Sequence, residues 1–194
     1  MLSEKLKSVF EQYNGTLPSK IAFQYGIDKE TLRKAYLRGD IERHMRGVYN
    51  LTENAFDEMF ALQSIYSKGV YSHESALYLH FYGTNVSHNY VMTFPEGYHA
   101  SSLKNSHIIV YNKKIPFYQL GISSAETMVG NKVYVYDKEK TILDMLSSGS
   151  AHEYDIREML EEYKVDEEKN INRLINYAEI LGQERLLERV FVYC

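Results

Sequence analysis

The sequence predicts an α+β protein in which a small N-terminal domain, residues 1–51, precedes a larger C-terminal domain, residues 52–194. Two observations indicate this division. Residues 1–51 combine helical periodicity with one hairpin, whereas residues 89–137 hold four short runs rich in Val, Ile, Tyr and Phe, followed by further helical periodicity. A chain of 194 residues is long enough for two domains of these sizes.

The N-terminal domain begins with three predicted helices. Leucine, valine and phenylalanine recur at helical spacing over residues 2–13, and Asn14-Gly15 ends this first helix, since both residues tolerate a left-handed conformation. Pro18 suits the first turn of a short second helix, which Gly26 breaks. Asp28 is a good N-cap for a third helix over residues 28–38.

A two-stranded hairpin is predicted directly after the third helix. Residues 41–51 alternate loosely, turn at Met45-Arg46-Gly47 and return as VYNL. Two short helices joined by a glycine-containing turn are typical of a helix-turn-helix, and a hairpin that follows them is a wing. Residues 1–51 are therefore predicted to form a winged helix-turn-helix.

Charge is distributed unevenly between the two predicted domains. Residues 1–51 carry nine Lys and Arg against six Asp and Glu, a formal charge of +3, and since the whole chain carries −4 the remainder carries −7. Such an imbalance favours a nucleic-acid partner for the N-terminal domain. The polar positions of the third helix and the hairpin are the predicted contacts to double-stranded DNA: Lys29, Thr31, Arg33, Lys34, Arg38, Arg43, His44 and Arg46.

The alternative for this basic surface is a solvated helix face that Glu30, Asp40 and Glu42 partly neutralise. Asp40 and Glu42 lie where a DNA-facing wing is better without acids. The DNA interpretation therefore requires that they turn inward or pair with arginines.

The C-terminal domain is predicted in three parts. A helix over residues 53–67, capped by Thr52, forms a bridge over 52–68. A mainly antiparallel sheet follows in 69–137, with strands at 89–94, 107–112, 117–122 and 132–137. The last part, 138–194, is a helical tail with helices at roughly 138–148, 152–163, 167–181 and 183–191.

Lysines that flank the predicted strands are candidates for secondary DNA contacts, provided that they cluster on one face: Lys113, Lys114, Lys132, Lys138 and Lys140. A different possibility is an enzyme of phosphate or nucleotide chemistry that uses Asp137 and Asp144, whose carboxylates would then converge in a cleft. Asp137 is, however, explained as a helix N-cap and Asp144 as a partner of a neighbouring loop. The stretch YSHESALYLH lacks HExxH spacing, because position 77 is Leu, and predicts a capped helix.

No metal site or cofactor is expected. The only cysteine is Cys194, which has no partner within the chain, and no Cys/His cluster has the spacing of zinc ligands. No apolar run is long enough for a membrane span or a signal peptide, so we expect a cytoplasmic protein.

Four segments, taken in order, resemble the AbiEi-type antitoxins of bacterial type IV abortive-infection systems. They are YGIDKETLRKAYLRGDIERHMRGVYNL, VYSHESALYLHF, NYVMTFPEG and VYVYDKEKTILDML. The resemblance implies a winged helix-turn-helix repressor that binds inverted repeats upstream of its own operon. It also implies a C-terminal domain that counters a nucleotidyltransferase-like toxin without forming a stable complex, and it implies no catalytic residues. The remaining alternative is a winged helix that binds a protein, whose third helix would then show an apolar outer face.

Overall fold

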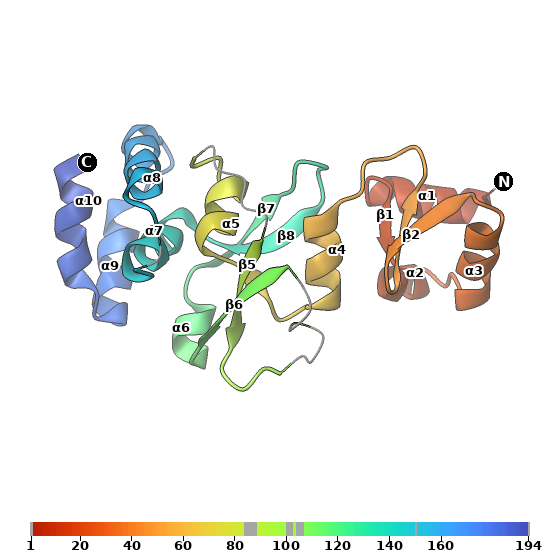
Figure 1. Ribbon diagram of the computed structural model, residues 1–194, viewed down its shortest axis with the longest axis horizontal. Helices are drawn as coiled ribbons and strands as arrows, with labels where there is room; N and C mark the ends of the chain where they lie inside the picture. The colour runs from red at the N-terminus through yellow and green to blue at the C-terminus, as the bar shows by residue number, and fades with distance from the viewer. Residues whose placement is uncertain (1, 84–88, 100–102, 104–106, 150, 194) are drawn as a thin grey trace. The chain divides into compact units, whose positions relative to one another are not determined.

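The computed structural model describes residues 2–83, 89–99, 103, 107–149 and 151–193, so Cys194 lies outside the described residues. The chain has an α+β fold and divides into two compact units (Figure 1). The first unit comprises residues 1–67 and 126–133, and the second comprises residues 68–125 and 134–194. None of the helices in the described ranges is long and apolar enough to cross a lipid bilayer.

The first unit contains four helices and a small sheet in the order α1 (Glu4–Gln12), β1 (Thr16–Pro18), α2 (Ser19–Gln24), α3 (Lys29–Leu37), β2 (Ile41–Met45), β3 (Val48–Leu51) and α4 (Glu58–Ile65). The strands are antiparallel in the order β1-β3-β2. The three helices and the hairpin predicted for residues 1–51 are confirmed as elements, whereas β1 was not predicted. β1 was missed because its three residues are too short to show alternation.

Capping and apolar spacing explain the helices of this unit. Ser3 caps α1 and Asp28 caps α3, each by accepting a hydrogen bond from a backbone N–H three residues further on. The apolar faces of α1, α2 and α3 then bury one core together with β1, β2 and β3: Leu6, Val9, Phe10, Leu17, Ala22, Ile27, Leu32, Ala35, Ile41 and Leu51.

The first unit extends beyond residue 51, because α4 and residues 126–133 pack with it. The predicted start of this helix at residue 53 with Thr52 as its cap is wrong, since α4 begins at Glu58 and Asp57 caps it. Asp57 is buried and also accepts hydrogen bonds from Thr127 Oγ1 at 2.5 Å and Asn131 Nδ2 at 2.8 Å. A segment 70 or more residues away in the sequence thereby becomes part of the unit.

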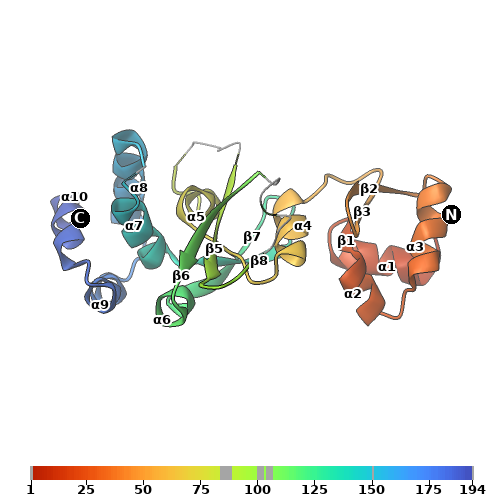
Figure 2. The same ribbon diagram turned by 60° about the horizontal axis from the view of Figure 1, so that its bottom comes forward.

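The second unit combines a five-stranded sheet with helices: β4 (Val70–Tyr71), α5 (His73–Leu79), β5 (Tyr90–Pro95), β6 (Ile108–Lys113), α6 (Ile115–Gln119), β7 (Ile122–Glu126), β8 (Lys132–Tyr136), α7 (Lys138–Ser147), α8 (Glu153–Val165), α9 (Ile171–Leu181), the 3₁₀ turn Glu184–Leu186 and α10 (Leu187–Tyr193). The helices predicted beyond residue 138 are confirmed. Figure 2 shows α7 to α10 packed together beside the sheet.

The strand order is β6-β5-β4-β8-β7, and the sheet is mixed. β4 pairs antiparallel with β5, but β5 pairs parallel with β6, and β4 pairs parallel with β8. The predicted mainly antiparallel sheet is therefore wrong. Its strands were correctly located at β5, β6 and β8, but strand direction depends on connections through helices, which local alternation does not reveal.

The strand predicted at 117–122 is also wrong, because α6 occupies residues 115–119 and β7 starts only at Ile122. Pro116 lies in the first turn of α6, where a missing backbone N–H costs nothing. Gly121 then adopts a φ of 75°, a left-handed conformation that glycine reaches without strain. The stretch FYQLGI was predicted as a strand because it is rich in aromatic and apolar residues, although it contains the end of α6 and the start of β7.

Candidate nucleic-acid interface

Helix α3 presents a basic outer face because its apolar residues point into the core. Leu32 and Ala35 are fully buried, whereas Lys29, Arg33 and Lys34 are exposed. Asp28 holds the first turn by accepting a hydrogen bond from Thr31 N at 2.6 Å. Three predicted contact residues therefore share the solvent face of one helix, while the Thr31 side chain is half-buried.

The β2–β3 hairpin presents the second predicted group. Ile41 and Val48 anchor its strands in the core, and the turn at Arg46-Gly47 is possible because Gly47 has a φ of 80°. Arg43, His44 and Arg46 are exposed on the hairpin. The His44 ring stacks on the Phe56 ring with centroids 4.4 Å apart, and this contact holds the His44 side chain in place on β2.

Ion pairs hold two of the eight predicted contacts. Arg33 donates to Glu30 through Nε at 2.8 Å and Nη2 at 2.9 Å, and Arg38 lies 2.8 Å from Asp40. The hydrogen bond from Arg33 holds the pKa of Glu30 below its ordinary value. These pairs are exposed, so each contributes little stability and can open when a phosphate or base arrives.

The two acids at the start of the hairpin, Asp40 and Glu42, each have a partner. Asp40 pairs with Arg38, as the DNA interpretation requires, and the hydrogen bond from Arg38 lowers the pKa of Asp40. Glu42 instead lies 3.1 Å from His44 Nε2, so its partner is a histidine and not an arginine. Within the described ranges, no carboxylate pairs with the side chains of four predicted contacts: Lys29, Lys34, Arg43 and Arg46.

Two exposed residues of α3 were not among the predicted contacts. Tyr36 is 45% exposed and Leu37 is 65% exposed, although both are large and apolar. They lie three and four residues after Arg33 and therefore on its side of the helix. Helical spacing from Arg33 would have placed Tyr36 and Leu37 on the exposed side of α3. They were missed because a tyrosine and a leucine within RKAYLR suggest core residues.

The five lysines proposed as secondary contacts do not form one face. Lys140 is fully buried, which excludes it as a DNA contact. Lys113 pairs with Asp144, and Lys138 pairs with Asp166 and Glu168. Lys114 and Lys132 are exposed, but they belong to different units. The five lysines therefore do not all lie on one exposed face, because Lys140 is buried.

Asp144 forms a buried charged cluster with two lysines. Its Oδ1 accepts from Lys113 Nζ at 2.8 Å and its Oδ2 accepts from Lys140 Nζ at 2.5 Å. The expected bond from Asp144 to a loop is therefore wrong, since its partners are the end of β6 and its own helix α7. The spacing of Lys140 and Asp144, four residues apart, was the available signal. Lys140 Nζ also lies 4.5 Å from the centre of the Tyr136 ring.

Burial alters the protonation of this cluster. Desolvation lowers the pKa of Lys140 to about 8, although the Asp144 carboxylate opposes that change. Desolvation alone would raise the pKa of Asp144, but the two ammonium groups outweigh it, so this pKa lies below its ordinary value. His73, stacked on Tyr111 with centroids 3.9 Å apart, has a pKa lowered by burial to about 4.

Asp137 has a different set of partners from Asp144. It caps α7, as predicted, by accepting from Lys140 N at 2.9 Å, and it accepts from Tyr177 Oη at 3.0 Å. The two carboxylates thus serve a helix cap and an ion pair, and they contact Lys140 through different atoms, its backbone N–H and its Nζ. Across residues 2–83, 89–99, 103, 107–149 and 151–193, no group of three or more His, Cys, Asp or Glu could hold a metal ion.

Comparison with known proteins gives a likeness of fold. No protein-family model matches the chain, and no curated protein matches its sequence. The structure is similar to the crystal structure of the RV2827C protein from Mycobacterium tuberculosis, with a TM-score of 0.55 and 10% sequence identity. The similarity covers 92% of this chain and 72% of that one, so it shows that the two chains share a fold over nearly all of the present sequence.

Proposed function

We propose that residues 1–51 are a winged helix-turn-helix with which this chain binds double-stranded DNA as a transcriptional repressor. In this proposal α3 is the recognition helix and the β2–β3 hairpin is the wing. The element order of residues 4–51 supports it, as does the basic outer face of α3. The observation that carries it is a group of four exposed cations without a carboxylate partner in the described ranges: Lys29, Lys34, Arg43 and Arg46.

These exposed cations can bind phosphates. Lysine and arginine side chains that remain available can neutralise phosphates and release counterions, which makes the affinity fall steeply with salt. Two copies of the chain on an inverted repeat would double the number of such contacts and match the symmetry of the operator. The acidic charge of residues 52–194 does not assist this binding and limits it to the N-terminal module.

The test is a gel-shift titration and footprint on the DNA directly upstream of the protein's own gene. Each single replacement by Ala at Lys29, Lys34, Arg43 or Arg46 should reduce the slope of log K against log salt by about 1 for each copy of the chain that is bound. Lys164→Ala is the matched control, because Lys164 is an exposed lysine of α8 in the second unit. The proposal fails if wild-type protein protects no site at low salt, or if the four variants bind like the control.

The resemblance of four ordered segments to AbiEi-type antitoxins extends the proposal to a biological role. We infer that the repressed operon is the protein's own, and that the second unit counters a nucleotidyltransferase-like toxin without a stable complex. Expression of the toxin gene beside it should arrest growth, and co-expression of this chain should restore growth. The Lys29, Lys34, Arg43 and Arg46 variants should still restore growth, and a chain that leaves the arrest unchanged would contradict the antitoxin role.

A protein-binding winged helix is the second candidate, because one observation favours it. Tyr36 and Leu37 give the outer face of α3 an apolar portion, which such a module would use against a partner protein. The basic residues around this portion favour DNA instead. No described contact favours an enzyme that uses Asp137 and Asp144.

A further inference from the structure

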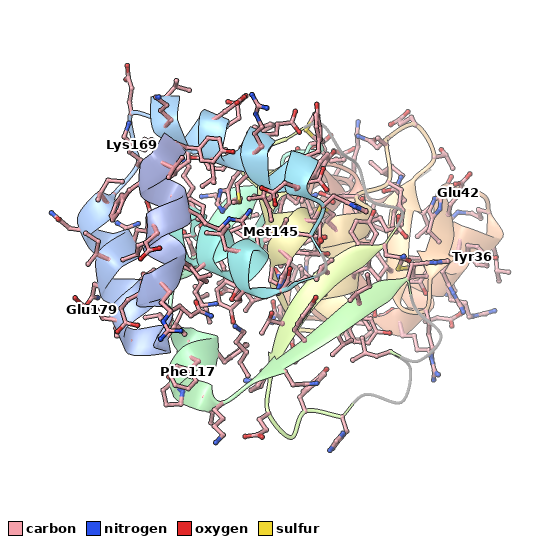
Figure 3. The ribbon with its side chains drawn as sticks, turned by 60° about the vertical axis from the view of Figure 1, so that its left-hand side comes forward. Tyr36, Glu42, Phe117, Met145, Lys169 and Glu179 are labelled. Carbon is pink, nitrogen blue, oxygen red and sulfur yellow. The ribbon has the colours of Figure 1, made fainter. Side chains whose placement is uncertain are left out.

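The outer face of α3 combines cations with exposed apolar side chains. Lys29, Arg33 and Tyr36 follow one another at intervals of four and three residues, and Leu37 follows Arg33 after four. Tyr36 is labelled at the periphery of the first unit in Figure 3. The core contacts of this helix are made by Leu32 and Ala35, so neither Tyr36 nor Leu37 is needed to hold α3 in place.

An apolar pair framed by cations matches one feature of the DNA major groove. The groove is bordered by phosphates, and within it the C5-methyl group of thymine is the apolar feature of the base edges. Lysine and arginine side chains would contact the phosphates, while an apolar side chain contacts the thymine methyl group. A partner protein with an apolar contact surface would not need the exposed cations Lys29, Arg33 and Lys34 on the same helix as the apolar pair.

We propose that Tyr36 and Leu37 contact thymine methyl groups in the major groove, which adds base specificity to the phosphate contacts. This inference rests on the proposed DNA binding. An α-helix rises about 1.5 Å per residue, so Arg33 and Leu37 are separated by about 6 Å along the helix axis. Arg33 and Leu37 can therefore contact bases of the same half-site.

Replacement of thymine by deoxyuridine tests this contact, because it removes only the methyl group. Each thymine inside the footprint is replaced singly, and the dissociation constant is measured for every duplex. We expect one or two positions in each half-site at which wild-type binding weakens about fourfold. That change corresponds to ~0.8 kcal/mol for one buried methyl group. At all other positions the replacement should have little effect.

The variants Leu37→Ala and Tyr36→Ala assign the methyl contacts. Each should bind the thymine duplex several-fold more weakly than wild type and should lose the difference between thymine and deoxyuridine at one of the sensitive positions. Val165→Ala is the matched control, since Val165 is 70% exposed on α8 in the second unit, and it should keep the full difference. Thermal melting confirms that the variants remain folded.

The outcomes separate this inference from the proposed function. If wild-type protein protects no DNA upstream of its gene, the proposed function fails and the inference fails with it. If it binds but no deoxyuridine position matters, or if both alanine variants keep the thymine preference, the inference alone is overturned. It is also overturned if the variants bind DNA normally but lose self-association in sedimentation, because the apolar pair then contacts protein.

Discussion

Lys140 Nζ lies 2.5 Å from Asp144 Oδ2 on the same helix, and neither side chain is exposed to solvent. Lys113 approaches the other oxygen of Asp144 from the end of β6 with 22% of its side chain exposed. One carboxylate therefore compensates two ammonium groups in the second unit.

Asp144→Asn should lower the free energy of unfolding by about 3–5 kcal/mol, because removal of one partner leaves a buried charge uncompensated. Glu161→Gln is the control, since Arg157 and Glu161 have the same four-residue spacing on α8 but are exposed. Its effect should stay within about 0.5 kcal/mol. Urea unfolding measures both values, and equal effects of the two substitutions would contradict a special role for the buried pair.

Acid should destabilise the second unit through His73. The unfolded chain takes up this proton near the ordinary pKa of 6.5, whereas burial lowers the pKa of the folded state to about 4. Between these values the unfolded chain binds more protons, so stability decreases as pH falls from about 6.5 to about 4, by up to roughly 3 kcal/mol. The measurement is a set of urea titrations at pH 4.5 and pH 7.

His73→Asn isolates the contribution of this histidine. His73 has a φ of 51°, and asparagine tolerates this left-handed conformation better than most residues. The variant should show a smaller loss between pH 7 and pH 4.5 than the wild type. A residual loss is expected, because burial also lowers the pKa of His80. Identical pH profiles for variant and wild type would refute the assignment to His73.

Asp57→Ala should destabilise the first unit by about 2–4 kcal/mol. The substitution removes the cap of α4, leaves the buried hydroxyl of Thr127 without its acceptor, and removes one of the two acceptors of Asn131 Nδ2, which also donates to Tyr13 O. Thr52→Ala, at the position that the sequence indicated as the cap, should change stability by less than about 0.5 kcal/mol, because Thr52 is exposed outside the helix. The pair of urea titrations decides which residue caps α4.

Arg33→Ala should weaken binding to the operator by about 1–3 kcal/mol if Arg33 contacts a base. Glu30→Gln should strengthen it, because Glu30 now holds the Arg33 guanidinium and adds a negative charge to the DNA-facing side of α3. Gel-shift titrations at two salt concentrations give both changes. If Glu30→Gln weakens binding instead, Glu30 positions Arg33 for DNA, and its role as a competitor is refuted.

Local patterns were sufficient for most helices and for most strands. Asp28 and Asp137 were identified as caps from sequence alone, because a cap depends on residues three positions apart. The same reasoning located β5, β6 and β8 but not β4, whose two residues carry no pattern. It also failed at Pro116, where an aromatic and apolar stretch suggested a strand and proline began a helix.

The sequence by itself determined the α+β composition, the order of the helices and the basic character of α3 and the hairpin after it, because these depend on residues near one another in the chain. Tertiary structure alone decided the parallel pairings of the sheet, the bonds from Asp57 to Thr127 and Asn131, and the burial of Lys140 with Asp144. Each of these joins or buries residues through the packing of distant segments. A lysine that is solvated in one packing is an ion-pair partner in another, and the sequence around it is the same in both.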